Sequence, residues 1–104
     1  MRRGLTILVA GADRDRWRSA LALAAAQAAS GGRARIHLDE RAVPLIAAET
    51  ALLDTALELG VAVSLCQSGL AEAGLDAATL DPRLHTGGLV GLLAALGDDR
   101  LAFA

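Results

Sequence analysis

The residues best suited to chemistry in this sequence are one cysteine and two histidines. Cys66 is the only cysteine, and it ends the apolar run VAVSLC just before the small-residue segment SGLAEAG. His37 lies near the end of ARIHLD, and His85 precedes TGG. A thiolate is a nucleophile, and an imidazole can assist it as a base or as a cation. Two histidines and one cysteine without short spacing match zinc sites poorly, so we predict thiol chemistry and no metal centre.

Cys66 is predicted to lie where a strand ends and a helix begins. Reactive groups in open α/β sheets gather at the carboxyl ends of the strands. The backbone amides of Gln67, Ser68 and Gly69 would form the first turn of the following helix, and their partial positive charge favours a thiolate. Gly69 also removes side-chain bulk beside the thiol. No Asp or Glu lies within five residues of Cys66 to oppose its ionisation.

Each of these three residues also has a structural interpretation. Free cysteine is among the most often buried residue types, and it behaves there as a small hydrophobe. Both histidines can be ordinary, partly exposed side chains, His37 beside Asp39 and His85 at the carboxyl end of a short strand. The sequence therefore leaves open whether Cys66 is reactive or structural, and whether His37 or His85 reaches the thiol.

Segments with strand and helix character alternate along the chain. Runs of β-branched and other apolar residues predict strands at residues 5–10, 34–39, 61–66, 83–86 and 100–104. Helix-forming segments cover residues 14–30, 49–59, 68–74 and 87–97, and a helical turn interrupted at Pro44 follows the second strand. This alternation predicts a three-layer α/β/α sandwich with a mostly parallel sheet of about five strands, in a single domain over residues 1–104.

Two of these helices carry patterns that predict their packing. In the helix at 14–30, Trp17, Leu21 and Ala24 share an apolar face, and Gln27 is predicted to lie off it. The closing helix, GGLVGLLAALG, is apolar almost all round, which is typical of a helix that is covered on more than one side. A chain of 104 residues cannot easily cover it alone, so we predict a homo-oligomer.

Composition and charge exclude several classes of function. Apolar residues make up 54% of the chain, which argues against disorder. The net charge is −2, and the basic residues cluster only at Arg2-Arg3 and in DRDRWR, so we predict no nucleic-acid partner. GADRDRW lacks the glycine pattern of a phosphate loop, and HTGG before a helix is too common a pattern to establish an anion site, so no cofactor is predicted.

The sequence also indicates where the protein works. No stretch approaches the roughly 20 apolar residues of a membrane span, so we predict no membrane association. MRRGLTILVAGA resembles an export signal, but its apolar run is shorter than the roughly 7–15 residues that a signal needs. A single cysteine permits no intramolecular disulfide, which fits a reducing cytoplasm. We therefore expect a cytoplasmic protein.

The segment VSLCQSGLAEAGL combines an apolar strand, a cysteine and a small-residue helix closed by Gly74. With ARIHLDERAVPLI and the alternation from LTILVA to RLAFA, it gives the whole chain a resemblance to the DsrE/DsrF-like family of small sulfur-relay proteins, related to TusD-type subunits. The resemblance implies a five-stranded α/β fold, assembly into trimers or hexamers, and a Cys66 that carries sulfane sulfur as a persulfide. The chain departs from the family at AEA before Gly74, where basic residues are common.

Three hypotheses of function follow. The first is a cytoplasmic sulfur carrier or sulfurtransferase-like protein that uses Cys66, with donor and acceptor thiols supplied by other proteins or small molecules because the chain has no second cysteine. The second is a non-enzymatic oligomeric subunit in which Cys66 is structural and the apolar closing helix is the functional surface. The third is a redox sensor that forms a disulfide between subunits through Cys66.

Overall fold

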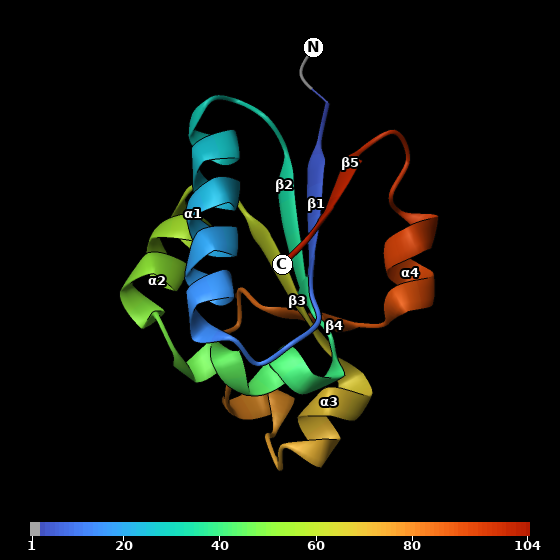
Figure 1. Cartoon of the computed structure of the whole chain (residues 1–104). Helices are drawn as coiled ribbons and strands as arrows, with labels where there is room; N and C mark the ends of the chain where they lie inside the picture. Colours follow the sequence, from blue (N-terminus) through green and yellow to red (C-terminus); the bar gives the residue numbers. More distant parts are fainter. Residues whose placement is uncertain (1–2) are drawn as a thin grey trace.

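Five strands form one sheet in which every paired neighbour is parallel (Figure 1). The strands are β1 (Leu5–Val9), β2 (Ala34–Leu38), β3 (Ala62–Cys66), β4 (His85–Gly87) and β5 (Arg100–Phe103). Their order across the sheet is β4-β3-β2-β1-β5. The computed structural model describes residues 3–104, so Arg2 of the predicted basic pair lies outside the described residues.

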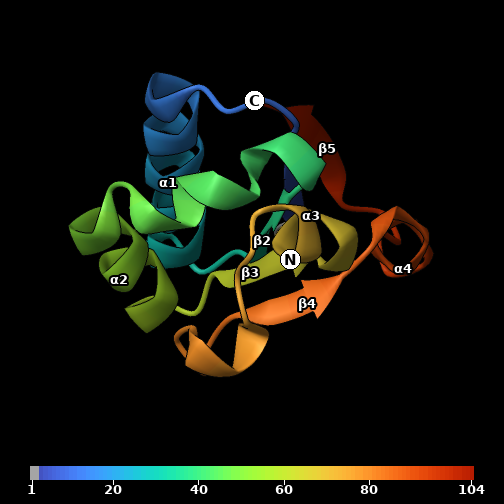
Figure 2. The ribbon, with the colours of Figure 1, turned by 90° about the horizontal axis from the view of Figure 1, so that it is seen from below.

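Helices lie on both faces of this sheet and at its carboxyl edge. They are α1 (Arg14–Ala29), the 3₁₀ helix η1 (Glu40–Ala47), α2 (Thr50–Glu58), α3 (Gln67–Glu72), the short 3₁₀ helix η2 (Ala77–Thr79) and α4 (Leu89–Ala94). Figure 1 shows α1 and α2 on one side of the sheet and α4 on the other. Figure 2, seen from below, shows η1 and α3 at the edge where β1, β2 and β3 end. The predicted three-layer α/β/α sandwich with a five-stranded sheet is confirmed.

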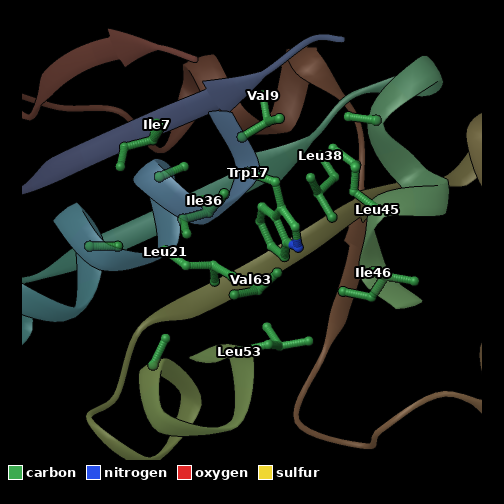
Figure 3. Packing of buried hydrophobic residues seen from close by; sticks show 14 of the residues in the cluster. Ile7, Val9, Trp17, Leu21, Ile36, Leu38, Leu45, Ile46, Leu53 and Val63 are labelled. Carbon is green, nitrogen blue, oxygen red and sulfur yellow. The ribbon is translucent and has the colours of Figure 1, made fainter. Parts of the chain in front are cut away.

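The main core lies between the sheet and the pair α1 and α2. Trp17 of α1 is fully buried at its centre, among Leu38, Leu45 and Val63 (Figure 3). Alternate residues of the strands supply the other wall, because successive side chains of a strand point to opposite faces. Within residues 3–104, no helix is long and apolar enough to cross a membrane.

Gln27 of α1 corrects one prediction, since its side chain is buried rather than turned away from the core. Its Nε2 donates to the backbone oxygen of Arg3 at 2.9 Å and, at 3.4 Å, to that of Arg33. The amide can lie in the interior because the segments that lead into β1 and β2 accept its hydrogen bonds.

The second face of the sheet is more polar and less covered. Register places Leu8 beside both Phe103 and His37, and His37 beside Ser64, which in turn pairs with His85. These five residues therefore form one row across the sheet, on the face that α4 covers. The row runs from Phe103, 72% exposed, through the buried His37 to the exposed His85.

The structure corrects the sequence prediction at Pro44, at the fourth strand and at the closing helix, which spans Leu89–Ala94 instead of residues 87–97. The predicted interruption at Pro44 is wrong, because η1 continues through it; a 3₁₀ segment loses only one hydrogen bond to a proline. The fourth strand begins at His85 instead of residue 83. Asp81 holds the preceding residues in a turn, since its side chain accepts from the Arg83 amide at 2.9 Å and its carbonyl from the Leu84 amide at 3.0 Å.

A buried carboxylate ties β1, β2 and the start of β5 together. The Asp99 side chain accepts hydrogen bonds from Thr6 Oγ1 at 2.9 Å, from Arg35 Nη2 at 2.9 Å and from Arg33 Nη2. Gly4 makes room for this cluster, since a Cβ there would overlap the Asp99 carboxyl group. Burial by itself would raise the pKa of Asp99, but the donors Arg33, Thr6 and Arg35 outweigh it and hold the pKa below its ordinary value.

Candidate functional site

Cys66 lies at the carboxyl end of β3, as the sequence predicts. It is the residue directly before α3, so the amides of Gln67, Ser68 and Gly69 form the first turn after it. The thiol is partly exposed, and its Sγ lies 3.2 Å from Ser68 Oγ. Cys66 also packs against the edge of the hydrophobic core. The position therefore combines access from solvent with one hydroxyl that can donate a hydrogen bond to sulfur.

Gly69 has a packing role in addition to the one predicted. A Cβ at this position would lie 2.7 Å from Val43 Cγ2 and 3.0 Å from the carbonyl oxygen of Glu40. The missing side chain therefore lets α3 pack directly on η1. It thereby sets the position of the helix that begins after Cys66.

We expect Gly69→Ala to destabilise the protein by about 1–3 kcal/mol, the usual cost of forcing extra atoms into a packed contact. The new methyl group can be accommodated only if α3 moves away from η1. Chemical denaturation followed by circular dichroism measures the loss. Gly11→Ala is the matched control, because no atom lies within 4 Å of a Cβ there. Equal stability of the two variants would contradict the packing role of Gly69.

His37 lies near the end of β2, as predicted, but it is only 1% exposed, so its interpretation as a partly exposed side chain is wrong. Its Nδ1 lies 2.7 Å from Ser64 Oγ on the neighbouring strand. Burial lowers the pKa of His37 below its usual 6.5, and the carboxylate of Asp39 opposes this only in part. The imidazole is therefore neutral at pH 7.

His85 is exposed, which agrees with its structural interpretation, but it begins β4 instead of ending it. The predicted position at a carboxyl strand end is thus wrong, because the turn at Asp81 delays the strand. His85 pairs in register with Ser64, whereas Cys66 pairs with Gly87 two residues further along. Within residues 3–104, the side-chain hydrogen bond of Cys66 is to Ser68 and neither histidine shares it.

A mainly apolar hollow lies elsewhere. A cavity of about 600 Å³ is lined by mainly apolar residues of η1, α2 and the segment from residue 73 to 84, with Asp54 and Arg83 among its polar ones. Cys66 and the histidines do not line it. Among residues 3–104, no three His, Cys, Asp or Glu side chains are grouped closely enough to hold a metal ion. Of the predicted site residues, the structure thus gathers Cys66, Gln67, Ser68 and Gly69 at one edge of the sheet.

Sequence reasoning missed Ser64 and Arg35, which share the α4 face of the sheet with His37. A signal for this face exists in both strands. In ARIHL the polar Arg35 and His37 alternate with apolar residues, and in AVSLC Ser64 stands two positions before Cys66. A period of two predicts that each pair shares one face.

Comparison with known proteins gives the fold only. No family model and no curated protein matches the sequence.

Three solved structures are similar over nearly their whole length. The ychN protein from E. coli has a TM-score of 0.81 at 20% identity, covering 99% of this chain and 100% of that one. MTH1491 from Methanobacterium thermoautotrophicum, a protein of unknown function, has a TM-score of 0.82 at 14% identity, with coverages of 99% and 100%. BT1422 from Bacteroides thetaiotaomicron, also of unknown function, has a TM-score of 0.78 at 18% identity, with coverages of 97% and 94%. The chain therefore has the α/β fold of these small proteins.

Proposed function

We propose that this protein is a small sulfur carrier that holds sulfane sulfur as a persulfide on Cys66. The observation that carries the proposal is the position of the thiol: partly exposed, at the carboxyl end of β3, directly before α3 and within 3.2 Å of the Ser68 hydroxyl. The resemblance of VSLCQSGLAEAGL to the sulfur-relay family supports it. The reducing cytoplasm is the proposed compartment, because a persulfide carrier needs a free thiol.

The proposed loading step is a thiol exchange. The Cys66 thiolate attacks the outer sulfur of a donor persulfide, R–S–SH, and forms the Cys66 S–S bond while the donor S–S bond breaks. The electron pair of the broken bond leaves with the donor as R–S⁻, and the proton stays on the transferred sulfur. An acceptor thiolate then attacks that outer sulfur, takes it, and releases Cys66 as a thiolate. Ser68 Oγ donates to the sulfur anion before loading and after release.

Mass spectrometry of the intact protein tests the proposal. After incubation with a low-molecular-weight persulfide, the wild type should gain about 32 Da, the mass of one sulfur atom, and a reducing thiol should remove it. Cys66→Ser should gain nothing. Ser68→Ala should still be loaded but more slowly, since it keeps the nucleophile and loses the hydrogen-bond donor. Absence of the adduct on the wild type, or an equal adduct on Cys66→Ser, would refute the carrier function.

The exposed apolar residues of α4 favour a second candidate function, a homo-oligomeric interaction subunit. No residue of α4 is buried in the single chain, and Val90 is 85% and Leu93 60% exposed. With Phe103 of β5, 72% exposed, they leave large apolar side chains in water, which is typical of surfaces that bind another protein. We propose a trimer or a hexamer built through α4, in which Cys66 need not react.

Sedimentation velocity of the purified protein tests this assembly. The wild type should sediment as an oligomer, and Val90→Asp should shift it to the monomer because a carboxylate in an apolar contact loses its hydration. Leu23→Asp is the control, since Leu23 is 51% exposed on α1, on the opposite side of the sheet. A monomeric wild type, or equal dissociation by both variants, would contradict assembly through α4.

A further inference from the structure

A cavity lies between the second face of the sheet and α4. Its volume is about 280 Å³, roughly that of nine water molecules at about 30 Å³ each. The polar residues that line it are Arg35 and His37 of β2, Ser64 of β3, and His85 and Thr86 of β4. Leu92 of α4 and several glycines and alanines complete the lining.

Two buried nitrogen atoms in this lining have no hydrogen-bond partner within residues 3–104. They are Arg35 Nε and His37 Nε2. Buried polar groups in proteins are almost always paired, and an unpaired one costs folding free energy, so two in one cavity wall call for a ligand or for bound water.

Both nitrogens can act as donors. The guanidinium of Arg35 is held by Asp99 Oδ2 at 2.9 Å and by the backbone oxygen of Ala95 at 2.8 Å, and both bonds use Nη2. Its Nε–H is left free. When the hydroxyl of Ser64 donates to His37 Nδ1, the neutral ring carries its proton on Nε2 and becomes a second free donor. Burial keeps the pKa of His37 low, so the ring remains neutral at pH 7.

The charge around the cavity selects the ligand. No Asp or Glu lines it. Arg35 shares its single carboxylate partner, Asp99, with Arg33, so two guanidinium groups face one negative charge. Arg33 is 61% exposed and does not line the cavity, so the charge at the cavity is that of the Arg35 guanidinium, which has only a share of one carboxylate, beside two unmet donors. An acceptor that carries negative charge on oxygen matches all three features, because hydrogen bonds to ionised acceptors are the strongest.

We propose that this cavity binds a small oxyanion, with oxygen atoms that accept from Arg35 Nε and His37 Nε2. The ligand is a short-chain organic carboxylate or an inorganic oxyanion of similar size. The polar residues of the strands can bind the oxygen atoms of either, and Leu92 of α4 can contact the apolar part of a carboxylate. The site is separate from the proposed sulfur chemistry. Cys66 does not line the cavity, so Cys66→Ser should leave binding unchanged.

NMR titration of ¹⁵N-histidine-labelled protein tests the proposal at constant ionic strength and pH 7. The probes are sodium propionate and sodium sulfate, with sodium chloride as the reference. We expect a saturable shift of the His37 ring signals with propionate, with sulfate, or with both. Saturation by propionate alone assigns an organic carboxylate, and saturation by sulfate alone assigns an inorganic oxyanion. Shifts that never saturate, or that chloride reproduces, overturn the proposal and leave the two nitrogens to water.

Three variants locate the binding. His37→Phe keeps a ring but removes Nε2, and Ala62→Leu fills the cavity from the same face of β3 while keeping both donors. Each should weaken binding by about tenfold or more, because the first removes a charge-assisted hydrogen bond and the second removes the space for the ligand. The affinity is measured from backbone amide shifts. Arg41→Gln removes one exposed charge that does not line the cavity and should change affinity less than about twofold, since a screened surface charge acts weakly. If Arg41→Gln weakens binding as much as the cavity variants do, the interaction is a general charge effect and the proposal fails. Should a cavity variant not fold, the wild-type titration of His37 still decides.

Discussion

Trp17→Ala should lower the free energy of unfolding by about 3–5 kcal/mol, the range found when a large aromatic side chain is removed from a core. Trp17 is fully buried between α1, the sheet and η1 (Figure 3). Removing its ring therefore leaves a cavity that the surrounding side chains can fill only in part. Its Nε1 also donates to the backbone oxygen of Ala48 at 3.1 Å, just after η1. The variant therefore loses apolar burial and the hydrogen bond that fixes the end of η1.

Thermal unfolding followed by circular dichroism measures this effect. At about 4 °C per kcal/mol, the lower end for a domain near this length, the melting temperature should fall by more than about 12 °C. Trp17→Phe is the intermediate control, because it restores most of the ring and omits only the indole N–H. Leu23→Ala lies on the same helix but 51% exposed, and it should change stability by less than about 0.5 kcal/mol. A Trp17→Ala protein as stable as Leu23→Ala would refute the central role of Trp17.

The second large effect is expected at Asp99. Asp99→Ala leaves Arg35, whose side chain is 20% exposed, without its carboxylate partner, and it leaves the Thr6 hydroxyl without an acceptor. Breaking a buried ion pair from one side costs about 3–5 kcal/mol. Because Arg33 is 61% exposed and can be hydrated again, we expect the lower end, about 3 kcal/mol. Asp98→Ala is the control, since it removes an exposed carboxylate from the adjacent residue.

The contribution of Asp99 should also depend on pH. Its pKa in the folded protein is held below the ordinary value of 3.8, so the folded state binds a proton less readily than the unfolded chain does. The stabilisation is complete above pH 3.8 and is lost as the pH falls through the lower, folded pKa. The difference in unfolding free energy between the wild type and Asp99→Asn should therefore be constant from pH 7 to about 5 and shrink below pH 3.8. A difference that stays constant down to pH 2 would show that the carboxylate charge is not what stabilises this cluster.

The sequence predicted the layers and the strand count because both depend on local patterns. LTILV is a run of β-branched residues and Leu, which is typical of a strand buried on both faces. In the structure it forms β1, which lies between β2 and β5 and has four of its five residues buried. Asp13 caps the start of α1 in the same local way, since its side chain accepts from the amides of Asp15 and Arg16, two and three residues along the chain. The position of Cys66 between a strand and a helix was likewise readable, since a change of period marks such a boundary.

The burial of the polar residues could not be read in this way. Gln27 and His37 are buried because their partners, Arg3 and Ser64, come from segments 24 and 27 residues away. The packing role of Gly69 could not be predicted either, because the atom that would collide with a side chain there belongs to Val43 in a different element. No local pattern specifies such partners, since hydrogen bonds and close contacts across the fold depend on which strands become neighbours.

By itself, the sequence determined the alternation of strands and helices, the apolar face of α1 and the place of Cys66 before α3, since each depends on residues a few positions apart. Only the tertiary structure decided that Asp99 gathers Thr6, Arg33 and Arg35, and that Arg35 and His37 line one cavity under α4. The order β4-β3-β2-β1-β5 brings these distant residues together. Their charges and unpaired donors become a site only when the sheet has formed and α4 lies across its second face.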